Sequence, residues 1–573
     1  MYQNEYLKYT YHKYDRKMKL KPSGNTFTAR FKSGKKSTFL KGISLLEIMD
    51  YERPEHPDTI ILARVNNIIL DLKQKIQDDC IIEWLTADSS EYKRSNQQTI
   101  CLVLIRAVNE LFPDKELLID HSLGKGLYCE LKNGIKLSRR KTRKIEKRML
   151  ELIAADDPID SLNVRREKAL DILEARHEKR AWLAGNELVS TLTLYRYGNT
   201  IDYLGYPLHI NTRHLSDFNL EHWSPGFILN IPDDEEIHPC PPEIKQKKLF
   251  QVFHEYGRWE GIYGIETVAN MNEAVQDKSV FDLIKIAEGL HEKKFAAISD
   301  QITRKRKSLR VILIAGPSSS GKTTFTKRLT IQLLVNGLNP HTISLDDYFL
   351  DRDITPVDKD GKHQFESLEA IDVPRFNEDL IALLEGKTVQ LPKYDFIEGK
   401  SVEGDTIQVG RNQPILIEGL HGLNEKLSSR IRQKNKLKIY VSALTQLNVT
   451  NHLRVPTSDV RLLRRMVRDA KFRNYTAHET IERWPEVRRG EEINIFPFQE
   501  EADIIFNTSL MYELAILRSV AVPLLESVKP GQSTYPEAQR LLQFLLCFLP
   551  ISADCVPLNS MLREFIGKSS FHY

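Results

Sequence analysis

The chain has 573 residues, of which 41% are hydrophobic and 28% are charged. This composition is typical of a globular protein and excludes a mostly disordered, collagen-like or fibrous chain. The 82 Lys and Arg residues nearly balance the 78 Asp and Glu residues, and the net charge of +4 argues against a protein that coats nucleic acid. At roughly 150 residues per domain, the length predicts three to four domains.

The cysteines and the apolar stretches indicate the compartment. The cysteines are scattered and form no CxxC pair, which is typical of a reducing environment. The first residues lack the apolar core of a signal peptide. The longest apolar stretch, residues 541–551, is shorter than the roughly 18 residues that a membrane-spanning helix needs. We therefore expect a cytoplasmic protein without membrane contact; its cysteines are Cys80, Cys101, Cys129, Cys240, Cys547 and Cys555.

Short β runs around a helical segment predict a small α+β module over residues 24–90. Apolar residues at helical spacing predict a helix over residues 99–111. A proline-rich, acidic stretch at 225–245 predicts a domain boundary, because proline blocks helix continuation. A helical connector is expected after it, at roughly 265–305.

A strongly basic stretch covers residues 136–148, KLSRRKTRKIEKR, in which Glu146 is the single acid. A charge run of this kind is compatible with a solvated helix face. It is also compatible with a contact to RNA or to another phosphate-bearing partner. The sequence leaves both interpretations open.

The strongest motif begins at residue 311, where the apolar run VILIA precedes GPSSSGKTT. This is the GxxxxGK[ST] phosphate loop between a strand and a helix. Glycines let successive backbone N–H groups turn toward phosphate oxygens, and the helix adds its positive end. Lys322 is placed to reach the β- and γ-phosphates, and the Thr323 hydroxyl to bind Mg²⁺. The chain is therefore expected to bind a nucleoside triphosphate.

Two acidic residues follow further predicted strands: Asp346 after residues 341–345, and Glu418 after residues 414–417. Ligands of parallel sheets bind at the carboxyl ends of strands. A carboxylate there can accept a proton from a substrate hydroxyl or hold Mg²⁺ through water. The alternative is an acid that caps the next helix.

Arginines recur at helical spacing after residue 459, at Arg461, Arg464, Arg465 and Arg468, with Arg473 beyond them. They could form a salt-linked surface or a lid that brings guanidinium groups onto the transferred phosphoryl group. No guanine-reading NKxD sequence accompanies the phosphate loop. A kinase with an acceptor substrate is therefore favoured over a GTPase switch.

These motifs resemble the uridine kinase/phosphoribulokinase family of P-loop kinases over roughly residues 300–520. The resemblance implies that Asp346 acts as the general base on a nucleoside 5′-hydroxyl, that Glu366 binds the ribose, and that Tyr394 and Phe396 line the base pocket. It rests on GPSSSGKTTF (316–325), SLDDYF (344–349), FESLEAIDV (365–373), LPKYDF (391–396), ILIEGLHGL (415–423), DVRLLRRMVRD (459–469) and the pattern at 502–517.

Two positions depart from that family. The ribose-binding acid is usually Asp and is Glu366 here, and Gly399 stands where the family has a base-reading His. A site that loses a hydrogen-bonding partner for the base discriminates less between bases. Phosphoryl transfer is therefore better supported than uridine as the acceptor.

The first half resembles threonyl-tRNA synthetase. Residues 61–89 resemble its TGS domain, a ubiquitin-like β-grasp, and residues 91–232 resemble its editing domain, notably at 104–131 and 195–212. The whole arrangement resembles bacterial nucleoside (uridine) kinases that carry such a front end. The editing domain's four metal ligands fall at Gln98, Leu102, Leu204 and Leu208, none of which suits zinc, so we expect no zinc site and no editing.

We therefore expect an α/β protein: a P-loop kinase with a parallel sheet, preceded by a β-grasp domain and an α+β editing-like domain. The expected divisions are an extension (1–23), the TGS-like domain (24–90), the degenerate editing-like domain (91–235), a helical connector (236–305), the kinase domain (306–520) and a helical tail (521–573).

The expected site has catalytic, nucleotide, acceptor and metal groups. The catalytic residues are Asp346, Lys322 and Arg468, and the acceptor is bound by Glu366, Tyr394 and Phe396. Thr323 and Glu418 would hold Mg²⁺ through water. The nucleotide-binding residues are Gly316, Pro317, Ser318, Ser319, Ser320, Gly321, Lys322, Thr323, Thr324, Arg465 and Arg473.

The leading hypothesis is a kinase that uses ATP or GTP and Mg²⁺ to phosphorylate a nucleoside, with uridine or cytidine as first guess. A kinase of another small hydroxylated metabolite is one alternative. A nucleotide-gated regulatory protein that binds tRNA or other RNA through its first half is the other. The sequence leaves the acceptor, the ATP or GTP preference, the oligomeric state and the role of the tail open.

Overall fold

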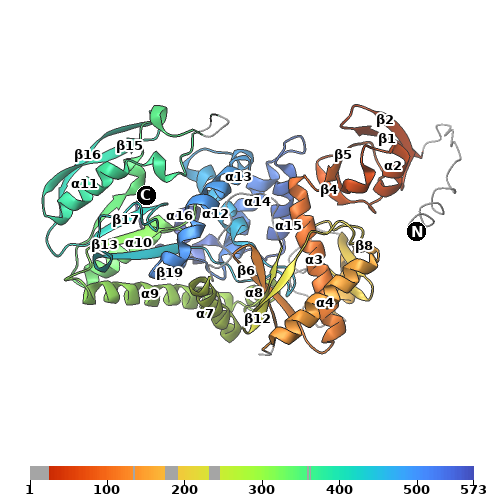
Figure 1. The fold of residues 1–573 in the computed structure, drawn as a ribbon, viewed down its shortest axis with the longest axis horizontal. Helices are drawn as coiled ribbons and strands as arrows, with labels where there is room; N and C mark the ends of the chain where they lie inside the picture. The colour runs from red at the N-terminus through yellow and green to blue at the C-terminus, as the bar shows by residue number, and fades with distance from the viewer. Residues whose placement is uncertain (1–24, 133–135, 175–190, 232–245, 358–360, 362) are drawn as a thin grey trace.

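The computed structural model describes residues 25–132, 136–174, 191–231, 246–357, 361 and 363–573. Figure 1 shows a five-stranded parallel sheet at one end, a five-stranded mixed sheet at the other, and helices between them. The predicted extension, Cys240 and most of the proline-rich boundary lie outside the described residues.

The first sheet has the strand order β2-β1-β5-β3-β4. Its outer pairs are antiparallel and β1 runs parallel to β5, which is the β-grasp arrangement predicted for this region. Helix α2 (Leu45–Glu52) begins at a capping box formed by Ser44 and Glu47 and buries its apolar side against the sheet. The strands are β1 (Thr26–Phe31), β2 (Lys36–Leu40), β3 (Ile60–Val65), β4 (Ile68–Asp71) and β5 (Cys80–Thr86).

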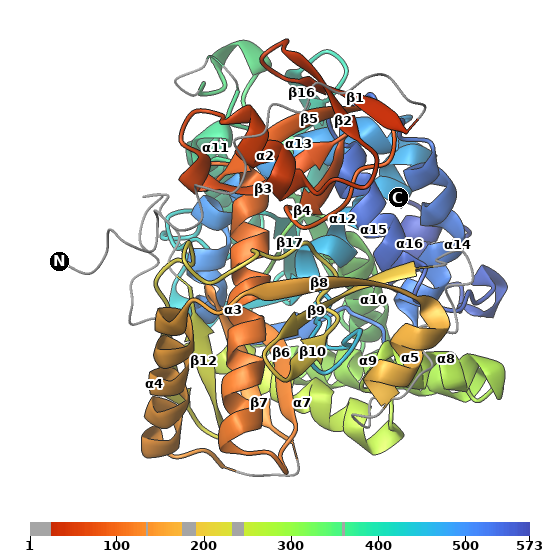
Figure 2. The ribbon, with the colours of Figure 1, turned by 90° about the vertical axis from the view of Figure 1, so that its right-hand side faces the viewer.

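The editing-like region contains two antiparallel sheets, ordered β11-β12-β7-β6 and β10-β9-β8. The long helix α3 (Ser90–Leu111) packs beside α4 (Arg139–Ala155), as Figure 2 shows. The predicted helix at 99–111 is therefore present but begins at Ser90, because its first residues are polar and give no apolar periodicity. The other elements are β6 (Leu117–Leu123), β7 (Gly126–Leu131), β8 (Ile159–Arg165), α5 (Arg166–Glu174), β9 (Thr191–Tyr197), β10 (Thr200–Asp202), β11 (Asn219–Trp223) and β12 (Gly226–Asn230).

Three helices connect the two halves: α7 (Lys247–Tyr263), α8 (Val268–Gln276) and α9 (Val280–Arg304). Helix α9 packs along α10 under the parallel sheet (Figure 1). Its Phe295 lies 5.1 Å from Phe325 of α10 and 4.7 Å from Phe506 of the sheet, measured between ring centroids. The connector is thus part of the core that supports the phosphate loop.

The parallel sheet has the order β14-β17-β13-β18-β19, with the phosphate-loop strand in the centre. The described residues contain no helix long and apolar enough to cross a membrane. The strands are β13 (Val311–Ala315), β14 (His341–Ser344), β17 (Ile415–Gly419), β18 (Lys436–Ser442) and β19 (Ile504–Asn507). The helices are α10 (Lys322–Val335), α11 (Val373–Leu384), α12 (Thr457–Phe472), α13 (Ala477–Asn494), α14 (Glu513–Glu526), α15 (Tyr535–Leu545) and α16 (Arg563–Ile566), with a 3-10 turn, η2 (Leu345–Tyr348), after β14.

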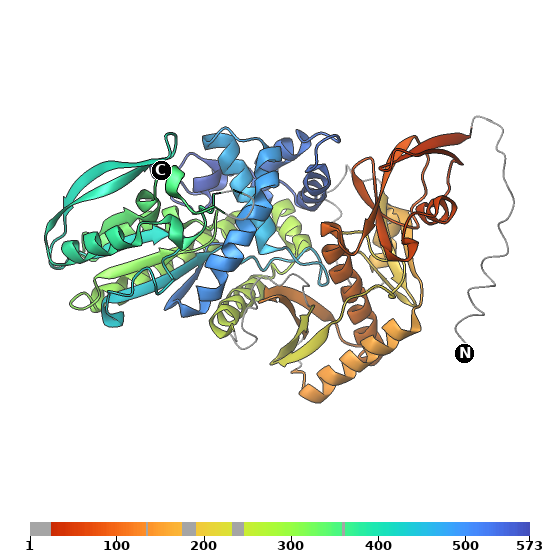
Figure 3. The same ribbon diagram turned by 45° about the horizontal axis from the view of Figure 1, so that its top comes forward.

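A hairpin that the sequence did not predict lies at the end of the molecule away from the β-grasp sheet (Figure 3). It consists of β15 (Thr388–Asp395) and β16 (Lys400–Gln408), paired antiparallel with a register shift beside Pro392. Strand β16 is largely polar and exposed, so it carries no apolar alternation.

The two halves meet at the segment that leads from β18 into α12. The backbone N–H of Ile119 donates to the carbonyl of Asn451, and Nδ1 of His452 lies 2.6 Å from a carboxylate oxygen of Asp202. Leu453 packs against Gly205, at which an added Cβ would lie 3.0 Å from the leucine side chain. The editing-like region therefore contacts the loop that positions α12.

Candidate active site

The phosphate loop follows the fully buried strand β13 and leads into α10. Gly316 is required by packing, since a Cβ at this position would lie 1.9 Å from the carbonyl oxygen of Val441. Ser319 and Gly321 have φ angles of +57° and +92°, which turn the loop back onto the helix. The first-turn N–H groups of α10, which have no partner within the helix, therefore face the loop.

Lys322 lies over the loop that precedes it. Its Nζ donates to the carbonyl oxygens of Gly316, at 2.9 Å, and Pro317, at 3.2 Å. Desolvation lowers the pKa of Lys322, and the carboxylates of Glu418 and Asp346 oppose this shift. The lysine and the two acids predicted at strand ends thus share one electrostatic environment.

Asp346 lies in η2, directly after β14, and Glu418 lies near the end of strand β17, before Gly419. Desolvation raises the pKa of both carboxyls, and the charge of Lys322 acts against the rise. Asp346 is exposed to solvent, although neighbouring protein groups desolvate its carboxyl, so a substrate hydroxyl can reach it. A raised pKa makes a carboxylate a stronger base toward a hydroxyl proton.

Thr323 and Glu418 form the oxygen pair that suits a magnesium ion. The Thr323 hydroxyl donates to Oε1 of Glu418 at 3.2 Å, and the Thr326 hydroxyl donates to Oε2 at 3.3 Å. Mg²⁺ prefers such oxygen ligands and takes the rest of its shell from phosphates and water. Across the described part of the chain, no three His, Cys, Asp or Glu side chains gather as a metal cluster. The Thr323 hydroxyl and the Glu418 carboxylate are oxygen ligands that fit Mg²⁺ held together with a nucleotide.

The expected acceptor residues meet beside these acids. Phe349 lies 5.6 Å from Tyr394, and Tyr394 lies 5.1 Å from Phe396, between ring centroids. The Tyr394 hydroxyl and Oε2 of Glu366 are buried without a hydrogen-bond partner, so both can bind a polar ligand. Burial raises the pKa of Glu366 to about 7, with Glu491 as the second cause. The sequence interpretation missed Phe349 and Phe365 as members of this aromatic cluster.

Gly399 lies in the hairpin turn with a φ of +70°. A Cβ there would lie 2.6 Å from the guanidinium carbon of Arg352, which also donates to the carbonyl of Phe396 at 3.0 Å. Arg352 thus fills the space that a side chain at residue 399 would need. Sequence reasoning noted the missing His but not this arginine, which lies far from it along the chain.

The arginines of α12 form two sets. Arg465 donates to the Ser318 hydroxyl at 2.8 Å. The carboxylate of Asp469 forms ion pairs with Arg465, Arg468 and Arg473 at 3.3, 3.1 and 3.6 Å. Arg461 and Arg464 are instead fully buried and pair with Glu491 and Glu513. The second set is therefore part of the core, whereas the first set is partly exposed beside the phosphate loop, a division that helical spacing alone does not reveal.

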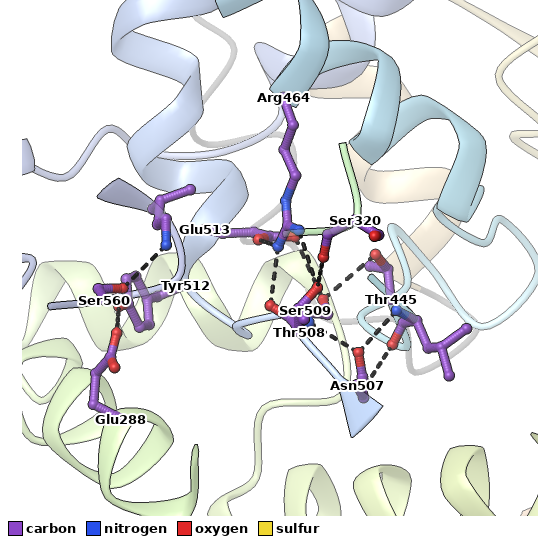
Figure 4. A network of polar contacts seen from close by, with 12 residues as sticks. Glu288, Ser320, Thr445, Arg464, Asn507, Thr508, Ser509, Tyr512, Glu513 and Ser560 are labelled. Atoms are coloured by element: carbon purple, nitrogen blue, oxygen red, sulfur yellow. Dashed lines mark hydrogen bonds and ion pairs between the residues drawn. The ribbon is translucent and has the colours of Figure 1, made fainter. Parts of the chain in front are cut away.

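The buried set ties α12 to the phosphate loop (Figure 4). Arg464 donates to the Thr508 hydroxyl at 3.1 Å and carbonyl at 3.0 Å, and pairs with Glu513. The Thr508 hydroxyl donates in turn to the carbonyl of Ser320 at 2.6 Å. The end of β19 and the loop therefore keep a fixed relation to α12.

Two carboxylates that the sequence interpretation missed accept hydrogen bonds from phosphate-loop groups. Oε1 of Glu491 accepts from the Ser318 N–H at 2.8 Å. Oε2 of Glu564 accepts from the Thr324 N–H at 3.2 Å and from its hydroxyl at 2.7 Å. Neither acid belongs to a local motif, so no sequence signal marked it.

In the editing-like region, three of the four positions expected for metal ligands are apolar and buried, unlike the polar positions around the phosphate loop. Leu102, Leu204 and Leu208, at the expected metal-ligand positions, are fully buried in one apolar core. Gln98 adds a carbonyl oxygen without a hydrogen-bond partner. His121 stacks on Phe253 at 4.0 Å and His209 on Tyr92 at 5.6 Å, so both rings pack among aromatic side chains.

A phosphate loop on a parallel sheet, acids at adjacent strand ends and an arginine helix that contacts the loop define a P-loop kinase. The model of the phosphoribulokinase / uridine kinase family matches residues 311–514. A uridine kinase of Deinococcus deserti is 29% identical over 208 residues, 36% of this chain and 91% of that relative. One of Lactobacillus helveticus is 30% identical over 178 residues, 30% of this chain and 74% of that relative. The chain belongs to the phosphoribulokinase / uridine kinase family.

The N-terminal part is similar to another class of protein. A threonine–tRNA ligase of Syntrophomonas wolfei is 26% identical over 180 residues, 31% of this chain. The match spans 28% of that ligase, so the similarity covers less than a third of its length.

Proposed function

We propose that this protein transfers the γ-phosphoryl group of ATP to the 5′-hydroxyl of a nucleoside, with uridine or cytidine as the first acceptors to test. The observation that carries the proposal is the meeting of Lys322, Asp346 and Glu366 beside the phosphate loop. The relatives named uridine kinase support the same chemistry.

In this proposal the loop N–H groups and Lys322 bind the phosphates of the nucleotide. Asp346 accepts the proton of the acceptor hydroxyl, and Arg465, Arg468 and Arg473 stabilise the charge of the transferred group. Glu366 and the Tyr394 hydroxyl orient the sugar, while Phe396 packs on the base. Thr323 and Glu418 would hold Mg²⁺, which neutralises the charge that develops on the phosphate oxygens.

The test is release of ADP from ATP, and of GDP from GTP, in the presence of a panel of nucleosides. Lys322→Ala should weaken nucleotide binding and transfer together. Asp346→Asn should spare nucleotide binding and lower turnover by about 10²–10⁴, the usual contribution of a general base. If a purified, folded protein releases no ADP or GDP in response to any nucleoside, the proposal of a nucleoside acceptor is wrong.

A kinase of another small hydroxylated metabolite is the second candidate within this class. Arg352 favours it, because its guanidinium fills the space beside Gly399, where the family has a base-reading His, and places a cation near Tyr394 and Phe396. Adding hydroxylated sugars and acids to the panel separates the two candidates. Turnover with such an acceptor and not with nucleosides would support this one.

An RNA contact through the N-terminal half is a candidate of a different class. The first two turns of α4 expose basic side chains without an ion-pair partner among the described residues: Arg139, Arg140, Lys141, Arg143 and Lys144. Binding of tRNA that weakens steeply with salt and is lost when these residues become Gln would support it. Undetectable binding at low salt would exclude it.

We further propose a cytoplasmic location, which the free thiols of the described cysteines support. The boundaries at 23/24, 90/91, 235/236, 305/306 and 520/521 are proposed as domain limits. Limited proteolysis with mass spectrometry tests them.

A further inference from the structure

The last described segment, residues 558–573, lies on the phosphate loop and is called the tail segment below. Figure 1 places the C mark beside α16, close to α10 and β17. Glu564 of α16 accepts the two hydrogen bonds from Thr324, and the Tyr573 hydroxyl lies 2.8 Å from the Thr324 hydroxyl. Two groups of the tail segment therefore converge on one residue of the loop.

Thr324 is in the first turn of α10, where backbone N–H groups have no partner within the helix. In a phosphate loop, these N–H groups bind the phosphate oxygens of the nucleotide. A carboxylate offers the same chemistry, since it is anionic and accepts several hydrogen bonds. Glu564 thus occupies hydrogen-bonding positions that a phosphate group would need.

Other contacts hold the tail segment in this place. Nζ of Lys471, in α12, donates to the carbonyl of Ile566 at 2.7 Å, and the Arg464 guanidinium lies 5.0 Å from the centre of the Phe565 ring. The side chain of Met561 packs so closely on Gly321 that a Cβ at the glycine would lie 2.8 Å from it. The tail segment therefore bridges the loop and the arginine helix.

We infer that the tail segment is an autoinhibitory element whose Glu564 carboxylate competes with nucleotide phosphate for the Thr324 N–H and hydroxyl. The inference rests on the nucleotide-binding role of the loop proposed above. Nucleotide binds once α16 has moved away from Thr324. The measured affinity is therefore the intrinsic affinity multiplied by the fraction of molecules in which the tail segment is displaced.

The test is Glu564→Gln, with Mg²⁺–ATP affinity measured by calorimetry. Loss of one charge-assisted contact should raise the affinity about tenfold, because the docked state is weakened while the intrinsic site is unchanged. Glu526→Gln is the matched control: it removes the same charge from an exposed position on α14, where affinity should stay as in the unmodified chain. Equal or weaker binding by a folded Glu564→Gln protein overturns the inference.

A second measurement needs no substitution. Hydrogen exchange of peptides within 558–573 is followed in the unmodified chain with and without Mg²⁺–ATP. Faster exchange on addition of nucleotide supports displacement, whereas unchanged or slower exchange overturns it. Both experiments omit an acceptor, so they can succeed even if no nucleoside is phosphorylated.

Discussion

Glu366 offers a direct test of the site's electrostatics. The aliphatic part of its side chain packs against Gly490, at which an added Cβ would lie 2.5 Å from the Cβ of Glu366. Burial and the neighbouring Glu491 raise its pKa from the usual 4.5 to about 7, although Arg465 opposes the shift. Ionising this carboxyl therefore destabilises the folded protein, and Glu366→Gln removes that cost while keeping the side chain's size.

The size and sign of the effect follow from linkage. The folded state keeps the proton up to about pH 7 and the unfolded chain releases it near 4.5, so stability falls as pH rises between these values. The rise of the Glu366 pKa from 4.5 to about 7 corresponds to at most about 3 kcal/mol of lost stability above pH 7 and about 1 kcal/mol at pH 5. Glu366→Gln should therefore stabilise the protein most at alkaline pH.

Scanning calorimetry from pH 5 to 8.5 measures this difference. At about 2–4 °C per kcal/mol, the kinase transition of the variant should lie roughly 6–12 °C above that of the parent at pH 8, and only a few degrees above it at pH 5. The control is Glu403→Gln, an exposed carboxyl on β16 without an ion pair among the described residues. A difference that is independent of pH, or larger at pH 5, would refute the reasoning.

Three further predictions concern the loop, the buried arginines and the interface. Gly316→Ala should lower nucleotide affinity at least about tenfold in a direct binding assay, because the added Cβ would clash with the Val441 carbonyl. The control is Gly289→Ala in α9, where the added Cβ has open space and should stabilise the folded protein by about 0.5–1 kcal/mol. Arg461→Met leaves Glu491 buried without its bidentate partner and should cost about 3 kcal/mol in urea unfolding, a loss that adding Glu491→Gln should partly reverse. His452→Ala removes the contact to Asp202 and should expose residues 446–455 to protease while nucleotide affinity stays unchanged; unaltered cleavage would contradict it.

Local motifs account for the parts of the fold and site that could be predicted. The phosphate loop was recognisable because its spacing is fixed by the strand, turn and helix that flank it. Asp346 and Glu418 could be grouped because β14 and β17 are adjacent and parallel, so their carboxyl ends meet. The β-grasp order was likewise predictable from its resemblance to a known domain.

The remaining contacts depend on distant parts of the chain. Glu491 and Glu564 meet loop residues 173 and 240 positions away, and no local pattern announces such a pair. The same holds for the arginines of α12, since helical spacing gives a common face but not the identity of its partners. Arg461 and Arg464 point into the core because the buried carboxylates of Glu491 and Glu513 pair with them there.

The synthetase-like half is linked to α12 by a chain of ion pairs. Arg94 of α3 pairs with Glu537 of α15 at 2.8 Å, and Arg540 joins Glu537 to Asp459 in the first turn of α12, each at 2.6 Å. These arginines hold the pKa of Glu537 well below its usual range, so the acid stays ionised and the chain of pairs persists at neutral pH. The helix that carries Arg465 and Arg468 is thus linked at its start to the N-terminal half and lies at its other end against the tail segment.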